Sequence, residues 1–264
     1  MDQRTKNSLL KIKHEQILKD RNRIINKTNF GFLQQHAGLR PGRYHLLLGP
    51  TSSGKTTVTR SILYDFLKNN PKKTVGIYLT EESVSDYEND YYQIEKSIDD
   101  FERMEIVSEK ENSNGIFDIA KNKHDLVIFD NLTTSTIYND KRPHDQSTFL
   151  LELKREIEST MSALLVVAHT QKGITINHNS VIYSSNIRGN DTASSIAEFA
   201  YILQTIKVES NWYQFITSDK FRGHNGSTPC HLLEYDKEKR CYTTSKAVKY
   251  SDFKEVFKLR NKLS

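Results

Sequence analysis

The segment at residues 49–56, with the sequence GPTSSGKT, has the residue types and spacing of a phosphate-binding loop. It matches the pattern G-x4-G-K-[ST], in which glycine lets the backbone turn its N–H groups toward phosphate oxygens. Within that pattern, Lys55 would reach the β- and γ-phosphates of ATP, and the Thr56 hydroxyl would bind Mg²⁺. The candidate contacts to the nucleotide are Gly49, Pro50, Thr51, Ser52, Ser53, Gly54, Lys55, Thr56 and Thr57.

The residues around this loop fit the setting that the pattern requires. Residues 44–48 are an apolar run of strand length, and residues 57–67 repeat apolar side chains at helical spacing. A strand, a glycine-rich turn and a helix thus follow one another in the order that phosphate-binding loops need. We therefore predict a nucleotide site that uses ATP and Mg²⁺, with an ordinary glycine-rich turn as the alternative.

Three carboxylates follow apolar segments that are typical of buried strands. Asp130 ends the run at residues 126–130, and Glu81 and Glu82 follow the run at residues 75–79. Ligands of α/β sheets bind at the carboxyl ends of the strands. We predict that Asp130 helps to hold Mg²⁺ and that Glu81 orients and deprotonates the attacking water, with Glu82 as the alternative base. Without a nucleotide role, Asp130 would cap a turn and the glutamates would stabilise a helix start.

Two further strand ends carry polar groups. His169 follows the apolar run at residues 163–168, where it would either sense the γ-phosphate or be an ordinary hydrogen-bonded core histidine. Lys220 and Arg222 follow a predicted strand at residues 213–218, and strand alternation places both on one face. They would bind phosphate in their own subunit or in a neighbouring one, or else form a solvated basic pair.

This order of motifs resembles the RecA-like ATPase core, especially the hexameric helicases of the DnaB type and the plasmid RepA type. The resemblance covers residues 36–235 and rests on GLRPG at 38–42, the phosphate loop, TEE at 80–82, FDNL at 129–132, VAHTQKG at 167–173 and KFR at 220–222. His169 is similar to the RepA-type residue, where DnaB-type helicases have glutamine. The resemblance implies that Lys220 and Arg222 reach the γ-phosphate of a neighbouring subunit, with Arg222 as an arginine finger.

The resemblance also implies a ring that works on nucleic acid. In such rings the loops after the strand that ends in the Mg²⁺-binding aspartate (here Asp130) and after the strand that ends in His169 line the pore, and here these loops are residues 133–146 and 172–190. Basic side chains in them would follow the backbone of single-stranded DNA, and ordinary solvated loops are the alternative. The candidate DNA contacts are Lys141, Arg142, Lys172, His178 and Arg188.

We therefore predict an ATP-hydrolysing, ring-forming DNA helicase or translocase of a plasmid-, phage- or virus-type replicon. Its partners would be single-stranded DNA, copies of the same chain in a hexamer, and a primase or loader. The RepA type is the nearer model, because DnaB-type helicases carry a separate N-terminal domain. The alternative is a RecA/RadA-like or KaiC-like ATPase that acts in recombination or regulation without strand separation. Transfer RNA prenyltransferases also contain GPTxSGKT, but they carry it almost at the N-terminus.

The composition describes a polar protein with a basic N-terminal segment. Of the 264 residues, 36% are hydrophobic and 27% are charged, and no apolar run approaches the roughly 20 residues of a membrane span. Cys230 and Cys241 are the two cysteines, and we interpret them as structural thiols of a reducing compartment, which predicts a cytoplasmic location. Residues 1–28 contain eight Lys or Arg and three acids, and this difference of +5 equals the net charge of the whole chain.

The expected fold class is α/β, a RecA-like P-loop NTPase whose mostly parallel sheet is covered by helices on both faces. Residues 1–28 are predicted to form a basic helix that serves as an assembly or linker element, or as an arm that binds nucleic acid. Residues 29–264 would form the ATPase domain. Further strands are predicted at residues 104–107, 199–206 and 231–235, helices at 83–98, 115–121, 148–161 and 251–263, and loops at 26–32 and 174–186.

Overall fold

A computed structural model describes residues 26–35, 37–95, 99–171, 183–189, 191–208, 211–221 and 230–248 of the chain. The helix predicted at residues 251–263 lies outside these ranges, and so does the basic N-terminal helix up to residue 25. Most of the second candidate DNA loop also lies outside them. No helix within the described ranges is long and apolar enough to cross a membrane.

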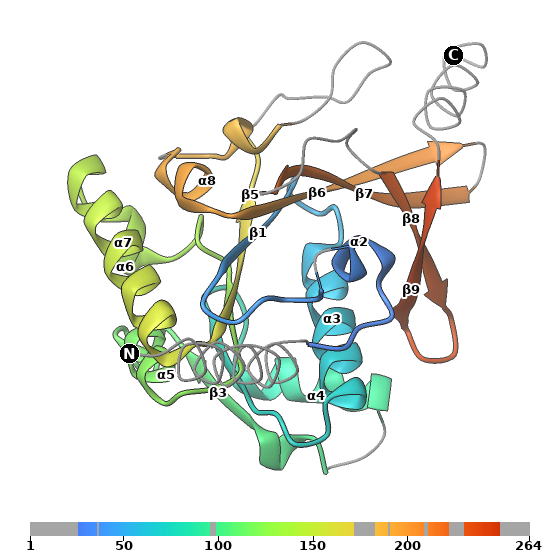
Figure 1. The fold of residues 1–264 in the computed structure, drawn as a ribbon, viewed down its shortest axis with the longest axis horizontal. Helices are drawn as coiled ribbons and strands as arrows, with labels where there is room; N and C mark the ends of the chain where they lie inside the picture. The colour runs from blue at the N-terminus through green and yellow to red at the C-terminus, as the bar shows by residue number, and fades with distance from the viewer. Residues whose placement is uncertain are drawn as a thin grey trace, which may run out of the picture.

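The strands form one nine-stranded sheet in the order β3-β2-β4-β5-β1-β6-β7-β8-β9 (Figure 1). Neighbours from β3 to β6 in this order are parallel, and β7, β8 and β9 continue the sheet as antiparallel neighbours. The predicted α/β fold with a mostly parallel sheet is therefore confirmed. The strands are β1 (Tyr44–Gly49), β2 (Val75–Leu79), β3 (Met104–Ser108), β4 (Leu126–Asp130), β5 (Ala163–His169), β6 (Phe199–Val208), β7 (Asn211–Phe221), β8 (Cys230–Asp236) and β9 (Cys241–Val248).

Helices cover both faces of the parallel part of the sheet. Leu47 of β1 belongs to the apolar core with α2, α3 and α4, whereas Leu46 and Leu48 belong to the core with α5, α7 and α8 on the opposite face (Figure 1). Every residue of β1, β2, β4 and β5 is buried, which explains their continuous apolar sequences. The helices are α2 (Gly31–Gln34), α3 (Lys55–Asn69), α4 (Val84–Glu95), α5 (Gly115–Lys121), α6 (Thr136–Asn139), α7 (Pro143–Thr160) and α8 (Thr192–Ile196), with 3-10 turns at Phe101–Arg103 and Ser184–Asn186.

Several elements differ from the sequence predictions. The helix predicted at residues 148–161 begins at Pro143, because proline suits the first turn, where its missing N–H has no helical partner. Together with α6, this start replaces much of the loop predicted at residues 133–146. Strand β9 and the short helix α2 are absent from the predictions. Strand β9 pairs with β8 and packs against α3, where the backbone N–H of Tyr242 donates to Ser61 Oγ at 2.9 Å.

The sheet brings the carboxyl ends of four strands to one edge. Gly49 at the end of β1 lies opposite His169 at the end of β5. Leu79 at the end of β2 lies opposite Asp130 at the end of β4. The residues that follow these strands therefore begin side by side, at the edge where ligands of α/β sheets bind.

Candidate active site

The phosphate loop connects β1 to α3 and depends on two glycines. Gly54 has a φ of 86°, a left-handed conformation that glycine adopts without steric cost, and it lies just before the first residue of α3. A Cβ atom on Gly49 would lie 2.7 Å from Ser53 Oγ, so the loop closes tightly only with glycine there. The carbonyl oxygen of Ser53 accepts hydrogen bonds from Thr205 Oγ1 at 3.1 Å and from Gln214 Nε2 at 2.9 Å. Strands β6 and β7 thus support the loop from the side.

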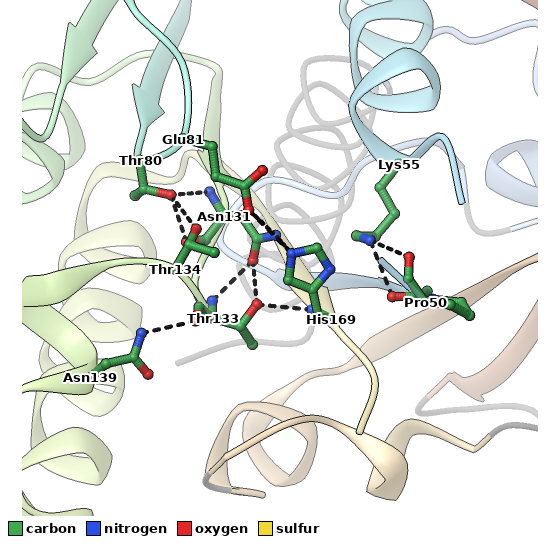
Figure 2. Close-up of polar contacts among 10 residues, drawn as sticks. Pro50, Lys55, Thr80, Glu81, Asn131, Thr133, Thr134, Asn139 and His169 are labelled. Carbon is green, nitrogen blue, oxygen red and sulfur yellow. Dashed lines mark hydrogen bonds and ion pairs between the residues drawn. The ribbon is translucent and has the colours of Figure 1, made fainter. Parts of the chain in front are cut away.

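Lys55 is held within this loop. Its side chain is buried, and Nζ donates hydrogen bonds to the carbonyl oxygens of Gly49 at 3.1 Å and Pro50 at 2.7 Å (Figure 2). Burial lowers the pKa of Lys55 to about 8, and the negative charges of Asp130 and Glu81 partly oppose this shift. A partly desolvated ammonium group favours an anionic ligand, because added negative charge stabilises its charged form.

Asp130 is a buried carboxylate that fits a cation site. Burial, followed by the charges of Glu82 and Glu81, raises the pKa of Asp130 to about 7. Its Oδ2 atom is buried and has no hydrogen-bond partner among the described residues. Oxygen ligands of this kind, with the Thr56 hydroxyl in the first turn of α3, suit Mg²⁺. A bound divalent cation would restore the ionised form of Asp130 by its own charge.

The two glutamates after β2 have different surroundings. Glu82 forms an ion pair with Arg60 of α3, which also pairs with Asp90 at 2.8 Å and stacks over the Tyr87 ring at 4.9 Å from its centroid. The Glu81 side chain is 49% exposed and forms no described ion pair with an arginine or lysine. Glu82 is therefore neutralised by a neighbour, whereas Glu81 keeps a solvent-facing carboxylate at the strand end.

His169 lies between Glu81 and the phosphate loop. Its Nε2 atom is 3.2 Å from Glu81 Oε1 and 2.8 Å from Asn131 Nδ2 (Figure 2). Its Nδ1 atom is buried and has no hydrogen-bond partner among the described residues. Burial and then the charge of Lys55 lower the pKa of His169 below the ordinary value, so the ring is neutral near pH 7. The structure thus brings together Lys55, Glu81, Asp130 and His169, the residues predicted for chemistry at four strand ends.

Thr80 connects two of these strand ends through the backbone of Asn131 and Asp130, a role that the sequence motifs do not reveal. Thr80 Oγ1 donates to the carbonyl oxygen of Asn131 at 3.0 Å, and the N–H of Asn131 donates to Thr80 Oγ1 at 2.9 Å. The N–H of Thr80 also donates to the carbonyl oxygen of Asp130 at 2.9 Å. The register that places Leu79 beside Asp130 is the signal that identifies this pair, and it is visible only once strand neighbours are known.

Lys220 lies away from the phosphate loop of its own chain. The register of β7 with β6 and of β6 with β1 places it at the level of Ala200 and Leu46, before the end of β1. Its Nζ donates to the carbonyl oxygens of Ser194 at 2.8 Å and Ser195 at 2.9 Å, near the end of α8. Its predicted partner Arg222 lies outside the described residues.

The candidate DNA contacts of the first loop lie between α6 and α7. Lys141 and Arg142 are both exposed. Arg142 Nε pairs with Asp145 Oδ2 at 3.1 Å, and Lys141 Nζ lies 6.0 Å from the centroid of the Phe149 ring. Both are therefore at the surface, with contacts to the first turns of α7.

The candidate contacts of the second loop are only partly described. Lys172 and His178 lie outside the described residues, and Arg188 is exposed. The N–H of Arg188 donates to the carbonyl oxygen of His169 at 2.9 Å, and Thr170 pairs with Ile187 in an antiparallel bridge. The end of this loop thus returns directly to the strand-end histidine.

A pocket of about 170 Å³ borders the start of α3. Thr57 and Arg60 line it from α3, Asp90 lines it from α4, and Tyr235 and Arg240 line it from the β8–β9 hairpin. The Tyr235 side chain is well exposed, so an aromatic ring stands at the edge of this space. The first turns of α3, which follow the phosphate loop, therefore border a polar pocket with an aromatic ring at its edge.

Solved structures of two other proteins have the same fold. The chain is similar over 83% of its residues to a DnaB-like replicative helicase studied with its interactions with primase, with a TM-score of 0.68 and 15% identity, and it spans 63% of that chain. It is also similar over 83% of its residues to the KaiC-like protein PH0186 of Pyrococcus horikoshii OT3, with a TM-score of 0.62, 14% identity and 97% of that chain covered. No protein-family model and no curated protein matches the sequence. The chain therefore shares the α/β fold of these two proteins.

Proposed function

We propose that this protein hydrolyses ATP at the carboxyl edge of its sheet and uses the reaction to move along single-stranded DNA. ATP hydrolysis is supported by one observation: the side chains of Lys55, Glu81, Asp130 and His169 lie together around one phosphate loop. A buried cation, a buried acid that can hold Mg²⁺ and an exposed carboxylate that can accept a proton are groups that support phosphoryl transfer to water, and the imidazole lies beside them.

Each side chain has one task in the proposed reaction. Lys55 offsets the charge of the β- and γ-phosphates. Glu81 accepts the proton of the water that attacks the γ-phosphorus, while the bond from that phosphorus to the bridging oxygen breaks and ADP leaves. Asp130 and Thr56 would hold Mg²⁺, which neutralises phosphate charge when bound. The base and ribose would lie in the pocket beside Thr57.

We further propose that the basic pair Lys220 and Arg222 acts between subunits of a hexameric ring. The position of Lys220, at the level of Leu46 and away from its own phosphate loop, supports a role across a subunit boundary. An arginine supplied by a neighbour stabilises transition-state charge in other NTPases. In this proposal residues 1–28 form the assembly element and residues 29–264 form the ATPase domain.

The motor function rests on the fold and on the loops after β4 and β5. The similarity to a DnaB-like replicative helicase supports it, and so do the exposed side chains of Lys141, Arg142 and Arg188. Lys172 and His178 would join them along the pore. A helicase of a plasmid-, phage- or virus-type replicon, acting in the cytoplasm with a primase or loader as partner, is the specific form that we propose.

A KaiC-like regulator is the second candidate, because the chain covers 97% of the KaiC-like structure and 63% of the helicase. Unwinding of a forked DNA substrate by the purified full chain, with ATP and Mg²⁺, distinguishes the two functions. A helicase releases the labelled strand, and the Lys55→Ala variant does not. Normal ATP hydrolysis without strand release, on forks with either polarity of tail, would favour the regulator.

A further inference from the structure

The side-chain amide of Asn131 can adopt only one orientation in its site. Its Oδ1 atom accepts two hydrogen bonds, from the N–H of Thr133 at 2.9 Å and from Thr133 Oγ1 at 2.7 Å. Turning the amide over would place its NH₂ group against the Thr133 N–H, so that two donors would face each other. Thr133 Oγ1 also accepts a hydrogen bond from the backbone N–H of His169 at 3.1 Å, which fixes the position of the Thr133 side chain. The Asn131 NH₂ group must therefore point toward His169 and Glu81.

This orientation decides which nitrogen of His169 carries the proton. Asn131 Nδ2 lies 2.8 Å from His169 Nε2 and 3.3 Å from Glu81 Oε1 (Figure 2). An amide nitrogen only donates, so Nε2 must accept. A neutral imidazole that accepts at Nε2 carries its hydrogen on Nδ1. With hydrogen on Nε2 instead, that N–H could reach Glu81 Oε1 at 3.2 Å, but it would face the Asn131 N–H group at only 2.8 Å. The shorter contact therefore decides the tautomer, and the Asn131 amide lies between the two acceptors.

The other ring nitrogen is the one that remains available. His169 Nδ1 is buried and has no hydrogen-bond partner among the described residues. Figure 2 shows it on the side of the ring that faces Lys55 and Pro50. A buried N–H without a partner is costly unless a ligand supplies an acceptor.

We propose that Asn131 is a positioning residue that holds His169 in the Nδ1–H tautomer, so that the ring presents a hydrogen-bond donor toward the phosphate loop. The second N–H of the Asn131 amide holds the Glu81 carboxylate. The target of that donor, a terminal phosphate oxygen of the nucleotide, rests on the proposed function. The tautomer itself rests only on the contacts of Asn131, Thr133 and His169. Asn131 thereby connects the candidate base to the candidate sensor.

Nitrogen NMR of the full chain with labelled imidazole rings tests the tautomer directly, above the ordinary histidine pKa of about 6.5. The chain has nine histidines, and the signal lost in His169→Gln identifies the relevant ring. We expect an unprotonated Nε2 and a protonated Nδ1 in the wild-type protein. In Asn131→Asp, a carboxylate replaces the donor, so we expect the hydrogen on Nε2. A protonated Nε2 in the wild-type protein, or an unchanged tautomer in a folded Asn131→Asp variant, would overturn the proposal.

Kinetics of Asn131→Ala test the positioning role, with Thr134→Ala as the control. Thr134 lies in the same network and contacts Thr80 Oγ1 and the Asn131 carbonyl oxygen, but not the Asn131 amide. Loss of one oriented donor costs about 100-fold or more in kcat in other enzymes, and we expect a fall of that order with little change in KM. Equal kcat values in Asn131→Ala and the control would contradict the role. If the wild-type protein shows no ATP hydrolysis, the proposed function fails, but the tautomer result remains valid.

Discussion

Replacing Glu81 and Glu82 separately by glutamine tests which carboxylate is the base. Glutamine keeps the shape of the side chain and removes its ability to accept a proton. Glu81 has a half-exposed carboxylate next to His169, whereas Glu82 is paired with Arg60. Removing a general base costs about two to four decades in rate, which corresponds to about 2.7–5.4 kcal/mol of activation free energy. We expect this loss in kcat for Glu81→Gln, with ATP affinity nearly unchanged.

Glu82→Gln is the matched control, because it changes the same group one residue away. The Arg60 and Glu82 side chains are 11% and 25% exposed, so the pair is only partly screened by solvent. Burial raises the pKa of Glu82 more than the Arg60 charge lowers it, so the pair adds little net stability, and Glu82→Gln should change the free energy of unfolding by less than about 1 kcal/mol and kcat by less than tenfold. Single-turnover hydrolysis, ATP titration and chemical denaturation measure the three quantities. A loss of two decades in Glu82→Gln, with a normal rate in Glu81→Gln, would refute the assignment.

Three further results are expected. Mixing Arg222→Ala subunits with Lys55→Ala subunits should restore part of the ATPase rate, because a mixed interface can pair an intact phosphate loop with an intact Arg222. If verified mixed rings recover no activity, Arg222 does not act between subunits. Deleting residues 1–25 should yield a folded monomer that still binds ATP, whereas an intact oligomer with weaker, less salt-dependent DNA binding would identify a nucleic-acid arm. The folded state lowers the pKa of His169, so the unfolded state takes up a proton first as the pH falls below about 6.5. As the pH falls below about 6.5, the free energy of unfolding of the wild-type protein, measured by urea titration, should therefore decrease more than that of His169→Gln. Parallel pH profiles for the two proteins would contradict the lowered pKa.

The fold could be predicted largely from the sequence because its central strands are buried on both faces. A strand in that position needs apolar side chains throughout, so residues 126–130 and 163–169 appear as continuous apolar runs that end in polar groups. The phosphate loop was equally visible, since its glycines serve a local backbone conformation. The start of α7 and the last strand were missed, because Pro143 resembles a loop residue and β9 mixes buried, half-buried and exposed side chains without regular alternation.

The contacts of the candidate site could not be predicted, because they depend on strand neighbours that are distant in sequence. Thr80 and Asn131 are separated by 51 residues and meet only through the register of β2 with β4. The difference between Glu81 and Glu82 depends on Arg60 of α3, which belongs to no recognised motif. Local sequence therefore places polar groups at strand ends, and the packing of other elements decides which of them stay available for chemistry.

Steady-state ATP hydrolysis by the full chain, measured with Mg²⁺ in the presence and absence of single-stranded DNA, tests the central claim most directly. Lys55→Ala is the control, because it removes the buried ammonium group from the phosphate loop. We expect hydrolysis that single-stranded DNA stimulates and that Lys55→Ala abolishes. Substantial hydrolysis in Lys55→Ala would contradict the assignment of the site, and a wild-type rate that does not respond to DNA would contradict the motor.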